Sequence, residues 1–334
     1  MNLPFRKKKE ENEELDPIPE IKPVRRRKKK EEPPKPWGRI ERLIIFIFLI
    51  GLPVLSIIFF IKSKSSRTAV PAKINAPIIN NFVPLATPDT DELNTTLNNE
   101  ISNLTGTYGI YLKSVDGSYS LGINDNIEFD GASLFKLPLM IAYYQAVDNG
   151  KIDPQTSYTL KYSDDEGGAG ILASMAPGTV VTYKDIVQAM GKNSDNTGFQ
   201  IMENVLGQDA ETNEISNLNM NNTDFSQSET TPYDIGSLFY QLNNTNLISN
   251  SSKDEFYSFL TNTDFENLIP AGVPSNIKVV HKYGADDGEL NDAGIVYAAK
   301  PYILVIMSKD IDEDQADVEI PKISKIVYDW STHE

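Results

Sequence analysis

The sequence predicts an α+β fold, in which strands from both ends of one domain form an antiparallel sheet flanked by helices. Strand patterns occur early, at residues 106–114 and 118–121, and again late, at 277–282, 294–298 and 302–307. The interval between these two groups is mainly helical in pattern. We therefore expect an α/β sandwich with a helical lobe inserted between the early and late strands.

Turn and cap residues support this order of elements. The pair Asp116-Gly117 separates the first two strands and is typical of a tight hairpin turn. Thr231, Pro232 and Asp234 match the N-cap, N1 and N3 positions of a helix start. Apolar residues at helical spacing predict further helices at residues 91–104, 134–147, 182–190, 196–206 and 320–330.

Four segments differ in composition. Residues 1–42 are charged and contain prolines, so we expect a disordered segment. Residues 43–61 form a nearly uninterrupted apolar run, long enough to cross a bilayer as a helix. Lysines follow this run where a cleavable signal would carry small residues, which favours a retained signal anchor. Residues 62–90 are typical of a tether, and residues 91–334 form the folded domain.

Charge predicts how the chain is oriented. Fourteen Lys and Arg precede the apolar run, so the N-terminus should stay cytoplasmic and the domain should lie outside a cell membrane that the chain crosses once. The basic clusters could suggest nucleic-acid binding, but they lie among carboxylates beside the span, and anionic lipid explains them better. Beyond Lys73 the chain carries thirteen basic and thirty-eight acidic residues, which should repel nucleic acid.

Composition also restricts the chemistry. The chain has no cysteine, which excludes disulfides, thiol catalysis and cysteine metal sites. Its two histidines are His281 and His333, too few for a typical zinc site, and His333 is the penultimate residue. We interpret His281 as a strand residue beside Lys282 and not as a catalytic base. No metal or other cofactor is expected.

Three short strings carry the chemistry. They are Ser-Leu-Phe-Lys at 133–136, Ser-Asp-Asn at 194–196 and Lys-Tyr-Gly at 282–284. Together they supply a nucleophile, two ammonium groups and a proton relay, which are the parts of a serine enzyme that works without a catalytic histidine.

The surroundings of Ser133 favour a catalytic role. An extended stretch ends at Gly131-Ala132 and a helical pattern follows, so Ser133 should lie at a helix N-terminus with Lys136 one turn along. A second S-x-x-K string, from Ser275 to Lys278, follows Gly272 and Pro274 in a predicted loop. We interpret that string as structural.

The order and spacing of these strings resemble the penicillin-recognising serine hydrolases, and most of all their class A β-lactamase branch. The likeness runs from about Asp91 to the C-terminus. It includes Pro-Gly-Thr at 177–179, Thr-Thr-Pro at 230–232 and Asn-Asp-Ala-Gly-Ile-Val at 291–296. The fold of that family has the arrangement predicted above.

The resemblance implies a role for each catalytic residue. Ser133 would attack a strained or activated amide carbonyl and form an acyl-enzyme. Lys136 would act as the base, with its pKa lowered by burial and by the charge of Lys282. Ser194 would relay the proton to the departing nitrogen, and Lys282 would hold both that relay and the substrate carboxylate electrostatically. The oxyanion hole would be the N–H groups of Ser133 and Ala285.

The resemblance also implies residues that bind the substrate. Asn196 would bond the amide of the substrate side chain, while Asp195 fixes the turn. Tyr283 and Gly284 would lie along the bound substrate. Tyr283 departs from the family, which has Thr or Ser there, and its hydroxyl cannot occupy the position from which the smaller residue contacts the substrate carboxylate.

A second departure concerns the release of the acyl group. Class A enzymes have an E-x-x-L-N loop whose Glu activates water, but here residues 222–225 are followed almost directly by 230–232. Glu214 and Glu229 are weak candidates for that base, because neither has the motif around it. Lys136 or another carboxylate could also act.

Three functions remain open on this basis. The first is a membrane-anchored β-lactamase-like hydrolase that opens β-lactams through a Ser133 acyl-enzyme and deacylates slowly. The second is a penicillin-binding, D,D-peptidase-like protein that acts on cell-wall peptides. The third is a non-catalytic binding module, which the intact motifs disfavour. The partner would thus be a β-lactam or a small substrate resembling a peptidoglycan peptide, and the outer domain would be monomeric.

The predicted topology can be tested on intact cells or spheroplasts. Added protease should digest the domain and leave a small N-terminal fragment, because only that fragment would lie behind the membrane. Immunoblots against tags at both ends would follow the two parts. Full protection of the domain would contradict this orientation.

Overall fold

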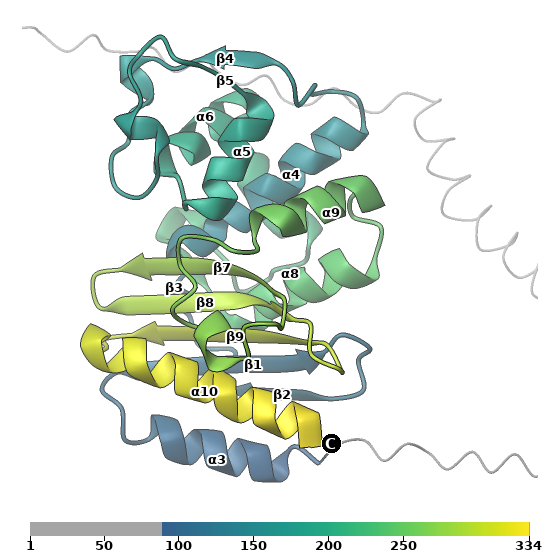
Figure 1. Cartoon of the computed structure of the whole chain (residues 1–334), viewed down its shortest axis with the longest axis vertical. Coiled ribbons are helices and arrows are strands. Elements are labelled where there is room, and N and C mark those ends of the chain that lie inside the picture. The colour runs from purple at the N-terminus through teal and green to yellow at the C-terminus, as the bar shows by residue number, and fades with distance from the viewer. Residues whose placement is uncertain (1–88, 334) are drawn as a thin grey trace, which may run out of the picture. The chain divides into compact units, whose positions relative to one another are not determined.

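The computed structural model describes residues 89–333, which form a five-stranded antiparallel sheet with helices on both faces (Figure 1). The predicted segments 1–42 and 43–61, and all but the end of 62–90, lie outside the described residues. Within 89–333 no helix is both long and apolar enough to cross a membrane.

The sheet draws its strands from both ends of the domain, as predicted. The spatial order is β2-β1-β9-β8-β7, with every neighbouring pair antiparallel. The strands are β1 (Thr107–Ser114), β2 (Ser120–Ile123), β7 (Val279–Asp286), β8 (Glu289–Val296) and β9 (Tyr302–Lys309). Two-stranded pairs join β3 (Phe129–Asp130) to β6 (Glu229–Thr230) and β4 (Ser157–Thr159) to β5 (Val180–Thr182).

Helices cover the sheet and build the lobe beside β7 (Figure 1). One face carries α3 (Asp91–Ile101) and α10 (Glu313–His333), and α8 (Pro232–Asn244) packs on the other. The lobe contains α4 (Lys136–Asp148), α5 (Tyr183–Lys192), α6 (Asn196–Leu206), α7 (Ala210–Asn217) and α9 (Asn250–Phe259). Apolar side chains form one core on each face, so the central strands are buried on both sides.

The predictions that rested on cap and turn residues were correct. Thr231 caps α8 by accepting a bond from the Asp234 N–H, with Pro232 at N1. The Asp116-Gly117 turn joins β1 to β2, and Gly117 has φ +79°, a left-handed conformation that glycine adopts without strain.

Several predicted boundaries were wrong. β7 runs on to Asp286 and not only to Lys282, because the Asp287-Gly288 turn folds it into a hairpin with β8. Helix α10 begins at Glu313 and not at Ile320. Its first turns were not predicted because they are polar and show little apolar periodicity. Helices α7 and α9 were not predicted; both are rich in Asn, Ser and Glu.

Candidate active site

Ser133 lies in a tight turn between a short strand and a helix. The chain passes from β3 through the 3₁₀ turn η2 (Ala132–Phe135) into α4. Asp130 holds this turn, because its Oδ1 accepts the Ala132 N–H at 2.6 Å. Ala132 has φ +43°, an uncommon backbone conformation for a residue other than glycine. Ser133 thus precedes a helix as predicted, but it belongs to the 3₁₀ turn.

Lys136 is the group positioned to act on Ser133. Its Nζ lies 2.7 Å from Ser133 Oγ and 2.8 Å from Asn196 Oδ1. Burial lowers the pKa of Lys136 to about 8, with Asp195 opposing the shift. A substantial share of this amine is therefore neutral near pH 8, and a neutral amine can accept the Ser133 proton.

Lys282 and Ser194 form the second pair of the site. Lys282 Nζ donates to Ser194 Oγ at 2.8 Å and to the Tyr283 carbonyl at 2.7 Å. Burial, and then the charge of Lys136, hold the Lys282 pKa well below its ordinary value. Ser194 has φ +53°, so its hydroxyl is presented from a strained turn.

Asp195 fixes the loop that carries Ser194 and Asn196. Its Oδ1 accepts the Gly198 N–H at 2.7 Å at the start of α6, and its Oδ2 accepts the N–H groups of Ile171 and Leu172. This carboxylate therefore joins the Ser-Asp-Asn turn to the neighbouring segment at two points and caps α6 at a third, in agreement with the turn-fixing role expected of it.

The predicted oxyanion donors meet where β7 passes η2. An added Cβ at Gly284 would stand 3.2 Å from Ser133 N, so glycine lets the strand approach closely. The His281 N–H bonds Leu260 and not β8, so it points off the open edge of β7. Because backbone groups alternate along a strand, the Ala285 N–H points off the same edge, toward the Ser133 turn.

A cavity of about 270 Å³ opens onto these groups. Three aromatic side chains line it: Phe225 lies 5.3 Å from Phe135 and 6.1 Å from Phe199, measured between ring centroids. Ser228 and Asp286 complete the wall beside Ala285. None of these wall residues was predicted, because nothing in the local sequence marks them and they converge only in the fold.

One predicted substrate-binding side chain lies elsewhere. The Tyr283 ring stacks on Phe265 at 4.5 Å and packs with the core under α10, on the face of β7 opposite Lys282. Its carbonyl oxygen, which accepts from Lys282, is what Tyr283 contributes to the cavity side. Successive strand side chains point to opposite faces, which places the Tyr283 ring on the face away from Lys282.

The weaker candidates do not line the Ser133 cavity. Glu214 is buried on α7 and accepts from Gln145 and Asn217, and burial raises its pKa. Glu229 lies in β6, paired with Asp130. Ser275 borders a different cavity, beside η6 (Pro270–Gly272).

A glycine-rich loop supports the site and was missed in the sequence. The run Gly167-Gly168-Ala169-Gly170 packs on the Ser-Asp-Asn turn, and an added Cβ at Gly170 would stand 2.3 Å from Asp195 Oδ2. The Ala169 carbonyl accepts the Asn196 N–H at 2.9 Å. Clustered glycines are a signal of close backbone approach, which could have identified this loop. Among residues 89–333, no group of His, Asp and Glu is arranged to hold a metal ion.

Comparison with known proteins agrees with this geometry. Residues 92–331 match the family described as the "Beta-lactamase enzyme family". Beta-lactamase VEB-1 of Pseudomonas aeruginosa is 23% identical over 273 residues, which cover 72% of this chain and 91% of that protein. The chain therefore belongs to the β-lactamase enzyme family, and it is a serine hydrolase.

Solved structures share the fold at similar identity. PBP-A aligns with a TM-score of 0.69 and 23% identity over 73% of this chain and 97% of that one. A variant of PBP-A, described as an acyl-enzyme complex with penicillin G, aligns with a TM-score of 0.68 at 23% identity, covering 73% and 97% of the two chains. A β-lactamase from Sphaerobacter thermophilus DSM 20745 gives 0.68, with 23% identity over 74% and 99%.

The depressed pKa of Lys136 can be measured directly. In protein labelled with ¹³Cε-lysine, one NMR signal should titrate near pH 8, because burial penalises the ammonium form. Loss of that signal in Lys136→Ala would assign it. A Lys136 midpoint at or above the ordinary lysine value of about 10.4 would contradict its role as a base.

Proposed function

We propose that the domain is an extracytoplasmic hydrolase that opens β-lactams through an acyl-enzyme on Ser133 and releases the product slowly. Two pairings carry this proposal: Lys136 with Ser133 at 2.7 Å, where both residues line the cavity, and Lys282 with Ser194 at 2.8 Å, next to Asn196 of the cavity wall. VEB-1 and PBP-A, to which the chain is similar, support β-lactams as the substrate class.

Acylation follows from these contacts. Neutral Lys136 takes the proton of Ser133 Oγ, and the oxygen bonds the lactam carbonyl carbon. The N–H groups of Ser133 and Ala285 stabilise the negative oxygen that develops. When the C–N bond breaks, the nitrogen takes a proton from Ser194, which regains one from the neighbouring ammonium groups. The product is a Ser133 ester, with the opened ring still attached.

Deacylation lacks an evident base. Among the described residues, the hydrogen-bond partners of Lys136 Nζ are a hydroxyl and an amide oxygen, and no carboxylate bonds it. The cavity wall next to it is aromatic, with the Phe199 ring centroid 5.9 Å from Nζ. Asp286, at the end of β7, is the carboxylate that lines this cavity, and it does not bond Lys136. Without a carboxylate placed beside Lys136, an attacking water loses general-base assistance worth roughly two to four powers of ten in rate.

A second candidate function would use the same pairing of Lys136 with Ser133. A penicillin-binding, D,D-peptidase-like protein that acts on cell-wall peptides would acylate by the same residues, and the penicillin G acyl-enzyme of the PBP-A variant is consistent with it. Steady-state hydrolysis of a chromogenic β-lactam, compared with release of D-Ala from a stem peptide, would separate the two functions.

The location of the domain is also part of the proposal. A helix at residues 43–61 would hold it outside the cell membrane, where β-lactams and cell-wall peptides are met. The support for this is the apolar run and the basic residues before it.

Labelling by a fluorescent penicillin should depend on Ser133 alone. Ser133→Ala should abolish labelling, and Lys136→Ala should slow it by a factor of about a hundred or more, because the base is lost. Ser275→Ala is the matched control and should label normally, since Ser275 borders another cavity. Labelling that survives Ser133→Ala would refute the assignment.

The second expected outcome is a burst followed by slow turnover. Intact-mass measurement after brief mixing with a penicillin should show a persistent adduct of one penicillin on Ser133, because the water lacks a base. Rapid hydrolysis with no visible adduct would contradict slow deacylation. In that case Glu214→Gln and Glu229→Gln are the first variants to compare.

A further inference from the structure

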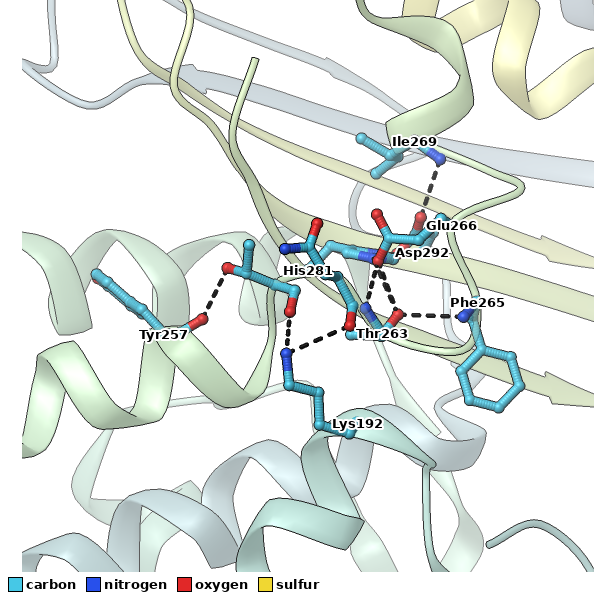
Figure 2. A network of polar contacts seen from close by, with 10 residues as sticks. Lys192, Tyr257, Thr263, Phe265, Glu266, Ile269, His281 and Asp292 are labelled. Carbon is cyan, nitrogen blue, oxygen red and sulfur yellow. Dashed lines mark hydrogen bonds and ion pairs between the residues drawn. The ribbon is translucent and has the colours of Figure 1, made fainter. Parts of the chain in front are cut away.

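His281 directly precedes Lys282 in β7, yet its side chain takes no part in the Ser133 cavity. Strand side chains alternate between faces, so the imidazole points away from the Lys282 ammonium, into a region where His281 is fully buried. Figure 2 shows the ring against the segment that joins α9 to η6. It cannot exchange a proton with Ser133, so its role has to follow from its own contacts.

Both ring nitrogens of His281 face carboxylates (Figure 2). Nδ1 lies 2.8 Å from Asp292 Oδ1 on β8, and Nε2 lies 3.1 Å from Glu266 Oε1 and 3.3 Å from Thr263 Oγ1. A ring donates to both sides only when both nitrogens are protonated. Burial alone lowers the His281 pKa, but the two carboxylates outweigh it and raise the pKa to about 9. At neutral pH the ring is therefore a buried cation.

The two carboxylates are themselves anchored to the backbone. Asp292 Oδ2 accepts the Ile269 N–H at 2.9 Å, and Glu266 Oε1 accepts the Thr263 N–H at 2.6 Å. One imidazolium thus joins β7 to β8 and to both ends of residues 263–269. Removing it would leave two buried or half-buried carboxylates without their cation, which is a costly arrangement.

This network meets the catalytic edge of β7. The His281 N–H donates to the Leu260 carbonyl at 2.8 Å on the open edge of the strand. The next groups on that edge are the Tyr283 carbonyl, which accepts from Lys282, and the Ala285 N–H. His281 thus contacts residues 260–269 twice, through its backbone at Leu260 and through its side chain by way of Asp292 and Glu266. These contacts hold the open edge of β7 immediately before the backbone groups that face the cavity.

We propose that His281 is a positioning residue, which holds the catalytic edge of β7 in place by bridging Asp292 and Glu266. The inference rests on the proposed acyl-enzyme chemistry. Held in this way, the Lys282 ammonium meets its relay serine and the Ala285 N–H faces the developing oxyanion. A displacement of the edge by about 1 Å would be enough to cost on the order of a hundredfold in rate.

The test is His281→Gln in the full-length protein, which keeps a donor and loses the charge. Its acylation rate constant at saturating penicillin should fall by about tenfold to a hundredfold. The affinity for penicillin before acylation should change less, because the oxyanion donor acts mainly in the transition state. An unchanged acylation rate constant in the folded variant would overturn the inference.

A matched control separates positioning from general loosening. Lys192 Nζ donates to the carbonyls of Thr261 and Asn262 in the same segment, without contacting the imidazole (Figure 2). Lys192→Ala should acylate at nearly the wild-type rate. Equal slowing of both variants at equal loss of thermal stability would overturn the inference.

If His281→Gln fails to fold, Glu266→Gln decides, because that side chain is 40% exposed and keeps its size. Slower acylation by the folded Glu266→Gln variant would support the inference, and wild-type acylation would overturn it.

A spectroscopic measurement tests the bridge independently of catalysis. The chain has two histidines, so ¹⁵N-imidazole labelling with His333→Gln leaves only His281 visible. Both ring nitrogens should be protonated at pH 8, and a neutral ring would overturn the inference. Failure of penicillin to acylate the wild-type protein would refute the proposed function as well, whereas normal acylation of His281→Gln refutes the inference alone.

Discussion

The site depends on two ammonium groups buried side by side without an ion pair. Lys136 and Lys282 are 5% and 1% exposed, and within residues 89–333 neither bonds a carboxylate. Their partners are hydroxyl, amide and carbonyl oxygens, which accept the hydrogen bonds but carry no negative charge to balance the ammonium groups. Desolvation therefore lowers both pKa values, and this keeps an amine available as a base. A carboxylate placed beside Lys136 would raise its pKa again.

The lack of a carboxylate bonded to Lys136 has a second consequence. Beside Lys136 the cavity wall is formed by Phe199 and Phe225, and the carboxylate that does line the cavity, Asp286, lies at the end of β7. An aromatic wall keeps the local environment apolar, which favours a neutral lysine, but it gives a water no base. In the function proposed above, acylation and slow release would both follow from this one arrangement of side chains.

The edge of β7 brings the two halves of the machinery together. Ser133 and Lys136 come from the start of the helical lobe, whereas Lys282 and Ala285 come from the sheet, and they meet because Gly284 allows close approach. An edge strand has free backbone groups on one side, which makes it a source of donors but leaves it poorly held. The buried imidazolium behind it supplies an anchor at that point.

The sequence by itself determined the parts that depend on near neighbours. The cap at Thr231, the hairpin at Asp116-Gly117 and the strands from both ends of the domain were predictable, because turn chemistry and periodicity are local. The three strings assigned to catalysis could be singled out for a similar reason, since each is contiguous. The extension of β7 to Asp286 was missed because a polar strand end shows no alternation and is held by its hairpin partner.

Only the tertiary structure decided which residues share a space. Phe199 and Phe225 meet from separate elements, Tyr283 turns away from the cavity to stack on Phe265, and His281 finds its two carboxylates on β8 and on a loop. No spacing along the chain encodes these contacts. They follow from the register of antiparallel strands and from the packing of the lobe against one edge, both of which are long-range properties of the fold.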